Sequence, residues 1–379
     1  MKVIAYYLPQ FHSIEENDHW WGEGFTEWTN TKKAKPLYDG HYQPRVPLND
    51  FYYNLTNKKH RQWQADLAKT YGLYGFCYYH YWFKGKRLLE KPFNDVLASG
   101  EPDFPFCLSW ANEPWTRTWD GSENDVLMPQ EYGNKKDWLE HFNYLINAFN
   151  DPRYIKIDGK PLFVIYNPED ILQCNEMLIY WQHLAKQNGL PGIYFIDTLS
   201  GSKNTAISGF DASIEFEPMY SLFNRIELYS AVKRSIKDLL KKWVRLLSLH
   251  KLSVFRNFTI DYYSFDDIWR KILERKISAT NRQIIPGAFV DWDNSPRKSQ
   301  HALIVKGATP EKFEKYLTMQ IDRSINDYQS SFLFINAWNE WAEGTYLEPD
   351  QQYKYGYLEA VRNAIKANSS ADQTPGGDK

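Results

Sequence analysis

The 379-residue chain has little of the features that most directly indicate a metal, a membrane or a nucleic acid. Its three cysteines, Cys77, Cys107 and Cys174, are odd in number and lack metal-type spacing, so neither disulfides nor a zinc site are expected. It has no run of about 18 apolar residues that would predict a membrane-spanning helix. The formal net charge of −2 gives no argument for a nucleic-acid partner. No glycine-rich phosphate loop appears, and we expect no metal and no cofactor.

The N-terminus also lacks the pattern of a secretory signal. Its residues, MKVIAYYLPQFH, carry one lysine and a short apolar run that Pro9 and Gln10 interrupt, and no small-residue cleavage site follows. Together with the few cysteines, this predicts a cytoplasmic protein.

Aromatic residues, in contrast, are abundant. They make up 17% of the chain, with 15 Trp and 27 Tyr. Two interpretations stay open. The rings could fill a Tyr- and Trp-rich core. They could also line a cleft in which flat faces stack on sugar rings and hydroxyls bond to them.

Short apolar runs recur along the chain and predict buried strands. Their apolarity is continuous rather than alternating, as in strands covered on both faces. The eight runs are 3–8, 74–79, 105–110, 161–166, 192–197, 212–217, 284–292 and 331–338.

Segments with helical periodicity separate these runs, for example 58–72, 135–149, 176–189 and 310–325. Gly72 and Gly189 stand where helices should end. The alternation predicts an α/β fold, a (β/α)₈ TIM barrel forming a single catalytic domain over 1–367 with long βα loops. A doubly wound open sheet is the alternative. We expect the polar tail, 368–379, to be disordered.

The predicted strand ends carry unusual side chains. Nearly every one offers a carboxylate, an aromatic ring or both, as in "YHYWF", "WANEPWTRTWDG", "EFEPMY" and "DWDN". In a barrel, these C-terminal strand ends face the active site. The pattern favours a carbohydrate cleft over a solvated rim.

The last strand ends in "NEWAEG", which places Glu340 and Glu343 three residues apart. Glycosidic-bond chemistry needs one protonated and one ionised carboxyl group. The charged form of a carboxyl crowded by Trp338, Trp341 and a second carboxylate is disfavoured. The plainer interpretation is that one of the two is exposed or caps a helix, but the strand-end position favours catalysis.

The blocks along the chain also resemble a known family. "WNEWAEG" resembles the E-W-x-E-G signature of glycoside hydrolase family 99, the endo-α-mannosidases and endo-α-mannanases. "AYYLPQFH", "WWGEGFTEW", "YYHYWF", "WANEPWTRTWDG" and "DWDNSPR" resemble the related WbsX-type proteins. Those proteins occur in bacterial surface-polysaccharide gene clusters and are commonly described as glycosyltransferases or lipopolysaccharide biosynthesis proteins. The resemblance covers roughly residues 1 to 365.

The resemblance implies a (β/α)₈ barrel and retaining cleavage of a glycan through a 1,2-anhydro sugar. Glu340 would match the base that deprotonates the sugar 2-hydroxyl, and Glu343 the acid/base at the leaving oxygen. The chain differs from many hydrolases of the family at Ala342, where they have His, so the sugar is not fixed.

Other residues are expected to contact the substrate, an oligosaccharide or polysaccharide. These are Tyr7, His12, Trp110, Asn112, Glu113, Asp291, Trp292 and Trp341. "NEP" at 112–114 also resembles the Asn-Glu acid/base motif of another retaining-glycosidase clan, which would make Glu113 the acid. That motif follows the fourth strand of its barrel, whereas here it follows the third. We therefore assign Asn112 and Glu113 to sugar hydroxyls.

Two further functions compete with hydrolysis. A glycosyltransferase in lipopolysaccharide or polysaccharide biosynthesis usually needs a diphosphate site, often D-x-D with a metal, and "DWD" at 291–293 is the nearby match. A lectin-like barrel without catalysis is argued against by the presence of both glutamates.

A basic helical insertion is predicted around 225–256. Apolar residues recur there at helical spacing, and Lys233, Lys237 and Lys241 form a row at i, i+4. An ordinary barrel helix explains the pattern. A second interpretation is peripheral contact with an anionic membrane, which would make the protein membrane-peripheral.

Overall fold

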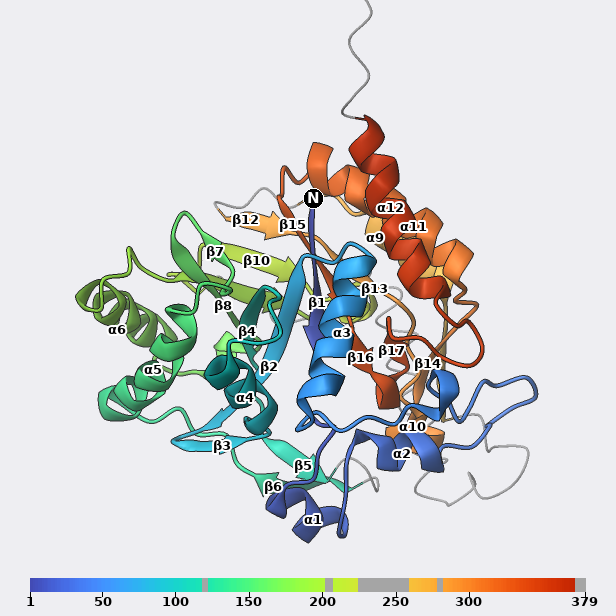
Figure 1. Ribbon diagram of the computed structural model, residues 1–379, viewed down its shortest axis with the longest axis horizontal. Coiled ribbons are helices and arrows are strands. Elements are labelled where there is room, and N and C mark those ends of the chain that lie inside the picture. The colour runs from blue at the N-terminus through green and yellow to red at the C-terminus, as the bar shows by residue number, and fades with distance from the viewer. Residues whose placement is uncertain (118–121, 202–206, 224–258, 278–281, 372–379) are drawn as a thin grey trace, which may run out of the picture.

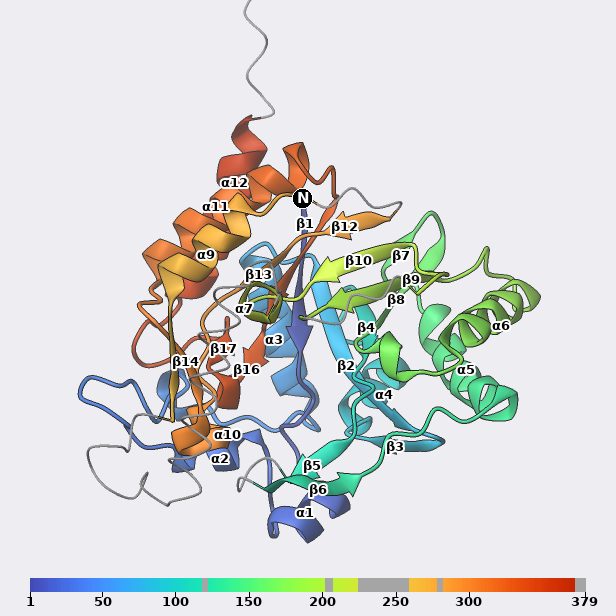
Figure 2. The ribbon, with the colours of Figure 1, turned by 180° about the vertical axis from the view of Figure 1, so that it is seen from behind.

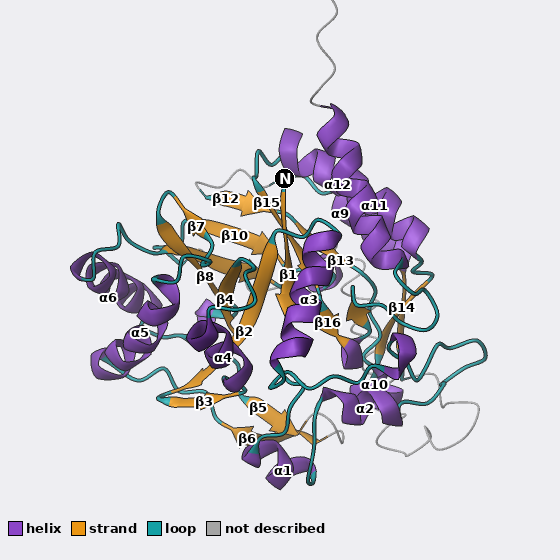
Figure 3. Ribbon diagram, viewed as in Figure 1, coloured by secondary structure: helices purple, strands orange, loops and turns teal. Residues whose placement is uncertain are grey.

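Strands form the centre of the molecule and helices its outside (Figure 3). The structure, a computed structural model, describes residues 1–117, 122–201, 207–223, 259–277 and 282–371. The central strands are β1 (Lys2–Tyr7), β2 (Gly75–Phe83), β4 (Phe106–Trp110), β8 (Lys160–Ile165), β9 (Tyr194–Leu199), β10 (Ala212–Glu215), β12 (Gln283–Ile285), β13 (Gly287–Phe289) and β15 (Phe332–Asn336). Each of the eight predicted runs contains or overlaps one of them.

These strands pair in parallel and in chain order, from β1 through β10 to β12. β13 pairs with β15, and β15 returns to β1, with Val3 opposite Leu333. β12 and β13 are the two halves of one barrel strand, interrupted at Pro286. The Pro286 carbonyl still accepts a hydrogen bond from the amide of Phe334, 3.2 Å away. The sheet therefore closes into the predicted (β/α)₈ barrel, and the open doubly wound sheet was the wrong alternative.

Helices cover the barrel. They are α1 (Glu15–Trp21), α2 (Glu27–Lys33), α3 (Lys58–Thr70), α4 (Lys91–Ser99), α5 (Lys135–Phe149), α6 (Cys174–Gln187), α7 (Met219–Phe223), α9 (Phe265–Glu274), α10 (Ser295–Lys298), α11 (Pro310–Asn326) and α12 (Gly356–Ala371). In Figure 1, α5 and α6 flank one side of the barrel, and α9, α11 and α12 flank the other. The predicted helices correspond to α3, α5, α6 and α11. Gly72 and Gly189 follow α3 and α6 with φ of 88° and 81°, as expected for helix ends.

The loops after the first and third barrel strands are long, as predicted. Residues 8–57 carry α1 and α2, and residues 111–134 carry the hairpin β5–β6. With α10, these elements gather at the end toward which β1 points (Figures 1 and 2).

The remaining elements are β3 (Lys86–Leu88), β5 (Trp115–Arg117), β6 (Ser122–Met128), β7 (Lys156–Ile157), β11 (Asp261–Ser264), β14 (Leu303–Lys306), β16 (Asn339–Glu340), β17 (Thr345–Tyr346), η1 (Leu48–Asp50), η3 (Pro168–Asp170), η5 (Ser299–His301) and η6 (Trp341–Glu343).

The core explains the continuous apolar runs. Every residue of β4 and β15 is buried, because one face looks into the barrel and the other meets the helices. Cys77, Cys107 and Cys174 are free and buried, so they pack as small core residues.

Two predictions concern regions that the structure describes little or not at all. The insertion 225–256 lies outside the described residues. α12 continues to Ala371, so residues 368–371 are helical where the sequence predicted a disordered tail, and 372–379 lie outside the description. Among the described helices, none combines the length and apolarity needed to cross a bilayer.

Closure of the barrel depends on a glycine next to the break. A Cβ atom at Gly287 would overlap the backbone carbonyl oxygen of Glu215. We expect Gly287→Ala to lower the free energy of unfolding by about 3 kcal/mol or more, since backbone cannot move aside as a side chain can. Gly40→Ala is the control, because Gly40 has a φ of 78° but open space around it. This change should lower the free energy of unfolding by about 1 kcal/mol. Urea denaturation measures both, and equal losses would contradict this role of Gly287.

Candidate active site

The turn after β15 presents both predicted glutamates. β16 pairs antiparallel with β17, and the 3₁₀ turn η6 joins them. Gly344 ends that turn with a φ of 67°, and a Cβ atom there would lie 2.9 Å from the amide nitrogen of Asp293. Only glycine satisfies both the backbone conformation and this close approach. The glycine of the E-x-x-E-G pattern therefore shapes the turn that carries the carboxylates.

Asn339 fixes this turn to the first strand. Its side-chain Oδ1 accepts from the amide of Leu8 at 2.7 Å, and its Nδ2 donates to the Leu8 carbonyl at 3.0 Å. The amide of Trp338 donates to the Tyr6 carbonyl at 2.8 Å. Glu340 therefore starts from a rigid position at the C-terminal end of the barrel.

Arg297, in the short helix α10 of the loop after the seventh barrel strand, lies between the two glutamates. Its Nη1 donates to Glu343 Oε1 at 2.6 Å, and its Nη2 donates to Glu340 Oε2 at 3.0 Å. No other hydrogen bond to either carboxylate is recorded in the described part of the chain. Each carboxylate therefore has one oxygen bound by Arg297 and a second oxygen left for a ligand.

A third carboxylate, Glu27, completes the cluster. Its side chain is fully buried, and both its oxygens accept from Arg297 Nη2, at 3.0 and 3.1 Å. Glu27 Oε1 also accepts from the amide of Ala342 at 2.8 Å, inside the turn that carries the pair. Glu27 lies in the first turn of α2, and the Glu27 amide donates to the Gln10 carbonyl. One guanidinium thus joins the loops after strands one, seven and eight.

The charges in this cluster do not balance. Burial raises the pKa of Glu340 well above its usual value, Arg297 opposes that rise, and the neighbouring carboxylates Glu343 and Glu27 add to it. Burial likewise raises the pKa of Glu27. Three carboxylates around one guanidinium favour retention of a proton within the cluster. Such an arrangement suits proton transfer, because one carboxyl can be acidic while another is basic.

Half-buried tyrosines surround the pair. Burial raises the pKa of Tyr79 and of Tyr81, and the charge of Glu340 is the next contribution for both. For Tyr166, the next contributions after burial come from Glu113 and then Glu343. The charges of these carboxylates thus act on the tyrosine hydroxyls. These tyrosines come from β2 and from the residue after β8.

Glu113 is exposed, in the loop after β4. It follows the C-terminal end of β4, as Glu340 and Glu343 follow that of the parallel strand β15, and its charge adds to the raised pKa of Tyr166. Its assignment to sugar hydroxyls stays a prediction.

Asp291 and Trp292 follow β13 at the same end. Asp291 accepts from Arg45 Nη2 at 2.8 Å and from the amide of Trp292, so both its oxygens are engaged. Arg45 Nη1 also donates to the Gly344 carbonyl at 2.8 Å, which makes Asp291 a support of the turn. The indole N–H of Trp292 is buried with no partner among the described residues, so a ligand contact stays a prediction for it.

Trp341 lies under the turn and offers no exposed face. It stacks on Tyr346 with ring centroids 3.8 Å apart and donates its indole N–H to Glu348 at 2.7 Å. These contacts explain its burial under the turn, and its predicted contact with substrate stays a prediction.

Two predicted contacts, Tyr7 at the end of β1 and His12 in the loop after it, belong to the packing around the barrel. Tyr7 is buried and donates to Gln64 Oε1 of α3 at 2.6 Å, because alternate residues of β1 face opposite sides and Tyr6 takes the interior. His12 is buried against the Pro9 carbonyl, and burial lowers its pKa to about 4. No hydrogen bond joins either of them to Arg297 among the described residues, and substrate contact stays a prediction for both.

The two predicted contacts near β4 are also engaged with the protein. Trp110 is buried and donates to the Trp82 carbonyl at 3.2 Å. Asn112 is fully buried and holds the Asn167 backbone, accepting from its amide and donating to its carbonyl, both at 2.7 Å. Asn112 thus ties the loop after the third barrel strand to that after the fourth, and its assignment to sugar hydroxyls stays a prediction.

Sequence reasoning missed Glu27, Arg297 and the three tyrosines. Glu27, Arg297, Tyr79 and Tyr81 lie in the blocks that carried the family resemblance, and Tyr166 ends a predicted strand; these are the signals that would have found them. Within the described ranges, no group of three or more His, Cys, Asp or Glu side chains is placed to hold a metal ion.

Comparison with known proteins places this site in a family. The family model described as "Glycosyltransferase WbsX" matches residues 3–361. Two curated relatives, both named "Uncharacterized protein WxcX", come from strains of Xanthomonas campestris pv. campestris. Each is 34% identical over 366 residues, covering 96% of this chain and 49% of the relative. The chain therefore spans about half the length of these relatives.

Solved structures share the fold. A GH99 endo-α-mannosidase from Bacteroides thetaiotaomicron superposes with a TM-score of 0.56 at 13% identity, covering 98% of each chain. A structure described as "Glycoside hydrolase-like protein" has a TM-score of 0.57 at 15% identity, covering 96% of this chain and 93% of its own. At such identities the likeness shows the barrel fold alone.

The cluster predicts a specific dependence of stability on pH. We expect Arg297→Met to lower the free energy of unfolding by about 3–5 kcal/mol at pH 7.5, because buried carboxylates lose the cation they share. A carboxyl whose folded pKa is raised stabilises the fold at low pH and loses that contribution as pH rises. The deficit should therefore shrink at pH 5.

Arg270→Met is the matched control, since Arg270 pairs with Asp267 at 2.8 Å and the two side chains are 61% and 59% exposed. Arg270→Met should lower the free energy of unfolding by less than about 1 kcal/mol at both pH values. Guanidinium denaturation at the two pH values measures both variants. A deficit for Arg297→Met that does not change with pH would contradict the shared-charge account.

Proposed function

We propose that this chain, which belongs to the WbsX glycosyltransferase family, is a retaining, endo-acting glycoside hydrolase of a bacterial surface polysaccharide or O-antigen-type glycan. Membership of the family assigns it to enzymes that act on carbohydrates. The observation that carries the finer proposal is the pairing of Glu340 and Glu343 on one guanidinium at the C-terminal end of the barrel. In TIM-barrel enzymes, that end carries the active site.

Each carboxylate has a separate role in the first step. Glu340 takes the proton of the sugar 2-hydroxyl, and the resulting oxygen attacks the anomeric carbon. Glu343 gives its proton to the leaving glycosidic oxygen as that bond breaks. The products of this step are the released glycan end and a 1,2-anhydro sugar.

The second step reverses the proton movements. Glu343, now ionised, takes a proton from a water molecule that attacks the anomeric carbon. The bond from that carbon to the 2-oxygen breaks, and the 2-oxygen recovers its proton from Glu340. Two displacements at one carbon restore the original configuration, so the product retains it.

The surroundings of each residue support this division of roles. Burial raises the pKa of Glu340, which makes its ionised form a stronger base toward a sugar hydroxyl. The Glu343 side chain is 23% exposed against 7% for Glu340, so it lies nearer solvent, where a leaving group and a water exchange. Arg297 supports both by fixing one oxygen of each.

The rest of the site suits a sugar ring. Tyr79, Tyr81 and Tyr166 provide flat faces and hydroxyls beside the pair. Glu113 is more exposed than the pair and would accept a hydrogen bond from a hydroxyl of a neighbouring sugar. The trans arrangement of 2-hydroxyl and leaving group that the mechanism needs fits an α-mannoside.

Glycosyl transfer is the second candidate, and the name of the family favours it. Its diphosphate and metal would have to use "DWD", yet Asp291 is bound by Arg45, and Asp293 accepts from His41 at 2.8 Å and Gln43 at 2.7 Å. Both aspartates are thus committed to protein partners. Titration with nucleotide sugars and with glycan fragments separates the two candidates: a transferase should bind the former.

Removal of either carboxylate tests the proposed roles. We expect Glu340→Gln and Glu343→Gln each to lower turnover of a cleavable glycan by about a hundredfold or more, because each removes a proton-transfer group. Thermal melting should show both variants folded. Glu131→Gln, which removes an exposed carboxylate, is the control and should keep normal turnover. A near-normal rate in either variant would mean that its glutamate is not catalytic, and Glu113 would become the first suspect.

A further inference from the structure

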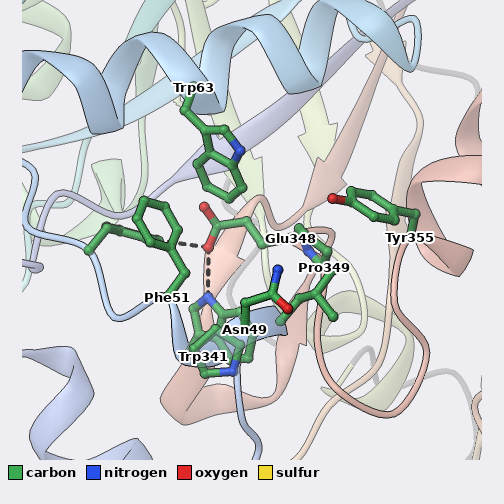
Figure 4. A pocket seen from close by; sticks show the side chains of 10 residues that line it. Asn49, Phe51, Trp63, Trp341, Glu348, Pro349 and Tyr355 are labelled. Atoms are coloured by element: carbon green, nitrogen blue, oxygen red, sulfur yellow. Dashed lines mark hydrogen bonds between the residues drawn. The ribbon is translucent and has the colours of Figure 1, made fainter.

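A cavity of about 290 Å³ lies behind the turn that carries the glutamates. Residues of the loop 47–53 line it, together with Trp63 of α3, Trp341 and the segment 348–355, and its lining excludes Glu340, Glu343 and Arg297. Figure 4 shows Trp63, Phe51 and Trp341 around the carboxylate of Glu348, with Tyr355 farther from it on the side of Pro349. The volume is at the lower end of the range for small-molecule sites, about 300 Å³, so one small ligand would fill it.

The carboxylate in this cavity has hydrogen bonds but no counter-charge. Glu348 is 2% exposed and accepts from the hydroxyl of Tyr53 at 2.8 Å, Gln64 Nε2 at 2.7 Å and the indole of Trp341 at 2.7 Å. All three donors are neutral, and no ion pair to Glu348 is recorded within the described residues. Burial raises the pKa of Glu348 to about 7, although these hydrogen bonds oppose the rise. By contrast, Glu340 and Asp291 are both paired with arginines.

The rim of the cavity is held in a rare backbone conformation. Asn49 and Asp50 have φ of 58° and 55°, in the left-handed region that costs non-glycine residues on the order of 1 kcal/mol each. Asn49 lines the cavity together with Trp341 (Figure 4). Backbone strain of this kind is often kept at ligand sites.

We propose that this cavity binds a small organic cation, a primary or quaternary ammonium compound no larger than one sugar ring. Aromatic faces attract ammonium groups because the ring quadrupole makes each face electrostatically negative, and the attraction is strongest away from water. The buried carboxylate supplies the counter-charge that the protein does not neutralise. A neutral sugar would use the same rings but would leave the charge of Glu348 unpaired.

The ligand would contact the catalytic turn from behind. Trp341 forms part of the cavity wall, and its chain neighbours are Glu340 and Ala342. The same indole is held by Glu348 and stacked on Tyr346. The site is thus separate from the reacting carboxylates but shares a residue with the element that carries them.

Binding of matched ligands tests the proposal. Titration calorimetry and saturation-transfer NMR would use choline, D-glucosamine and D-glucose, of which the last two differ by one ammonium group. Choline or glucosamine should bind the wild type with millimolar affinity and glucose should not. The choline and glucosamine titrations distinguish a quaternary ammonium from an amino sugar.

Variants locate the site. Glu348→Gln and Trp63→Ala should each weaken binding about tenfold or more, through the lost charge and the lost ring. Glu131→Gln, with the same change in net charge at the surface, should bind normally. Glu343→Gln should also bind normally, which separates this cavity from the acidic active site. Trp63 on α3 is only half-buried, so we expect Trp63→Ala to fold. This variant can therefore still test the site if Glu348→Gln does not fold.

Three outcomes would overturn the proposal. The first is that neither cation binds the wild type at tens of millimolar. The second is that glucose binds as tightly as glucosamine, which would indicate a neutral sugar site. The third is that Glu343→Gln abolishes binding while Glu348→Gln and Trp63→Ala retain it, which would move the cation to the active site.

Discussion

The guanidinium of Arg297 is the interaction on which the site depends. It reaches Glu27 from the loop after the first strand and Glu340 and Glu343 from the loop after the last. A carboxylate pair without a nearby cation would repel itself and move apart in a buried site. With three carboxylates on one cation, the pair is held close, and the cluster keeps an excess of negative charge that favours a bound proton.

The barrel brings these loops together. β1 and β15 are neighbours only because the sheet closes, and closure passes through the interrupted strand at Pro286 and Gly287. The side chain of Asn339 bonds both the amide and the carbonyl of Leu8, as a neighbouring strand would, and Gly344 allows the turn to approach Asp293 closely. The ion pair of Asp291 and Arg45 supports the same turn from the other side. The positions of the carboxylates are thus fixed by backbone contacts as well as by charge.

The sequence predicted the fold well because the fold depends on local patterns. Runs of apolar residues and helical periodicity show where each element lies, and Gly72 and Gly189 show where two helices end. The E-x-x-E turn was also visible, since it follows a strand. Glu27 and Arg297 were not predicted, because an ion pair between residues 27 and 297 leaves no local pattern. The face of the sheet on which Tyr7 lies was not predicted, because its strand is buried on both faces and apolarity did not distinguish it from Tyr6. The hydrogen bonds of Asn112 were not predicted, because their partner, the Asn167 backbone, lies in another loop.

The configuration of the first product tests the central claim most directly. That claim is that Glu340 acts as the base and Glu343 as the acid around one sugar. Proton NMR of a cleavage reaction, recorded before the released sugar equilibrates, shows which anomer forms first. The account predicts the anomer with the configuration of the substrate bond, because two displacements at one carbon restore it. An inverted first product would require water to attack directly, and would contradict the anhydro-sugar mechanism and the roles assigned to both glutamates.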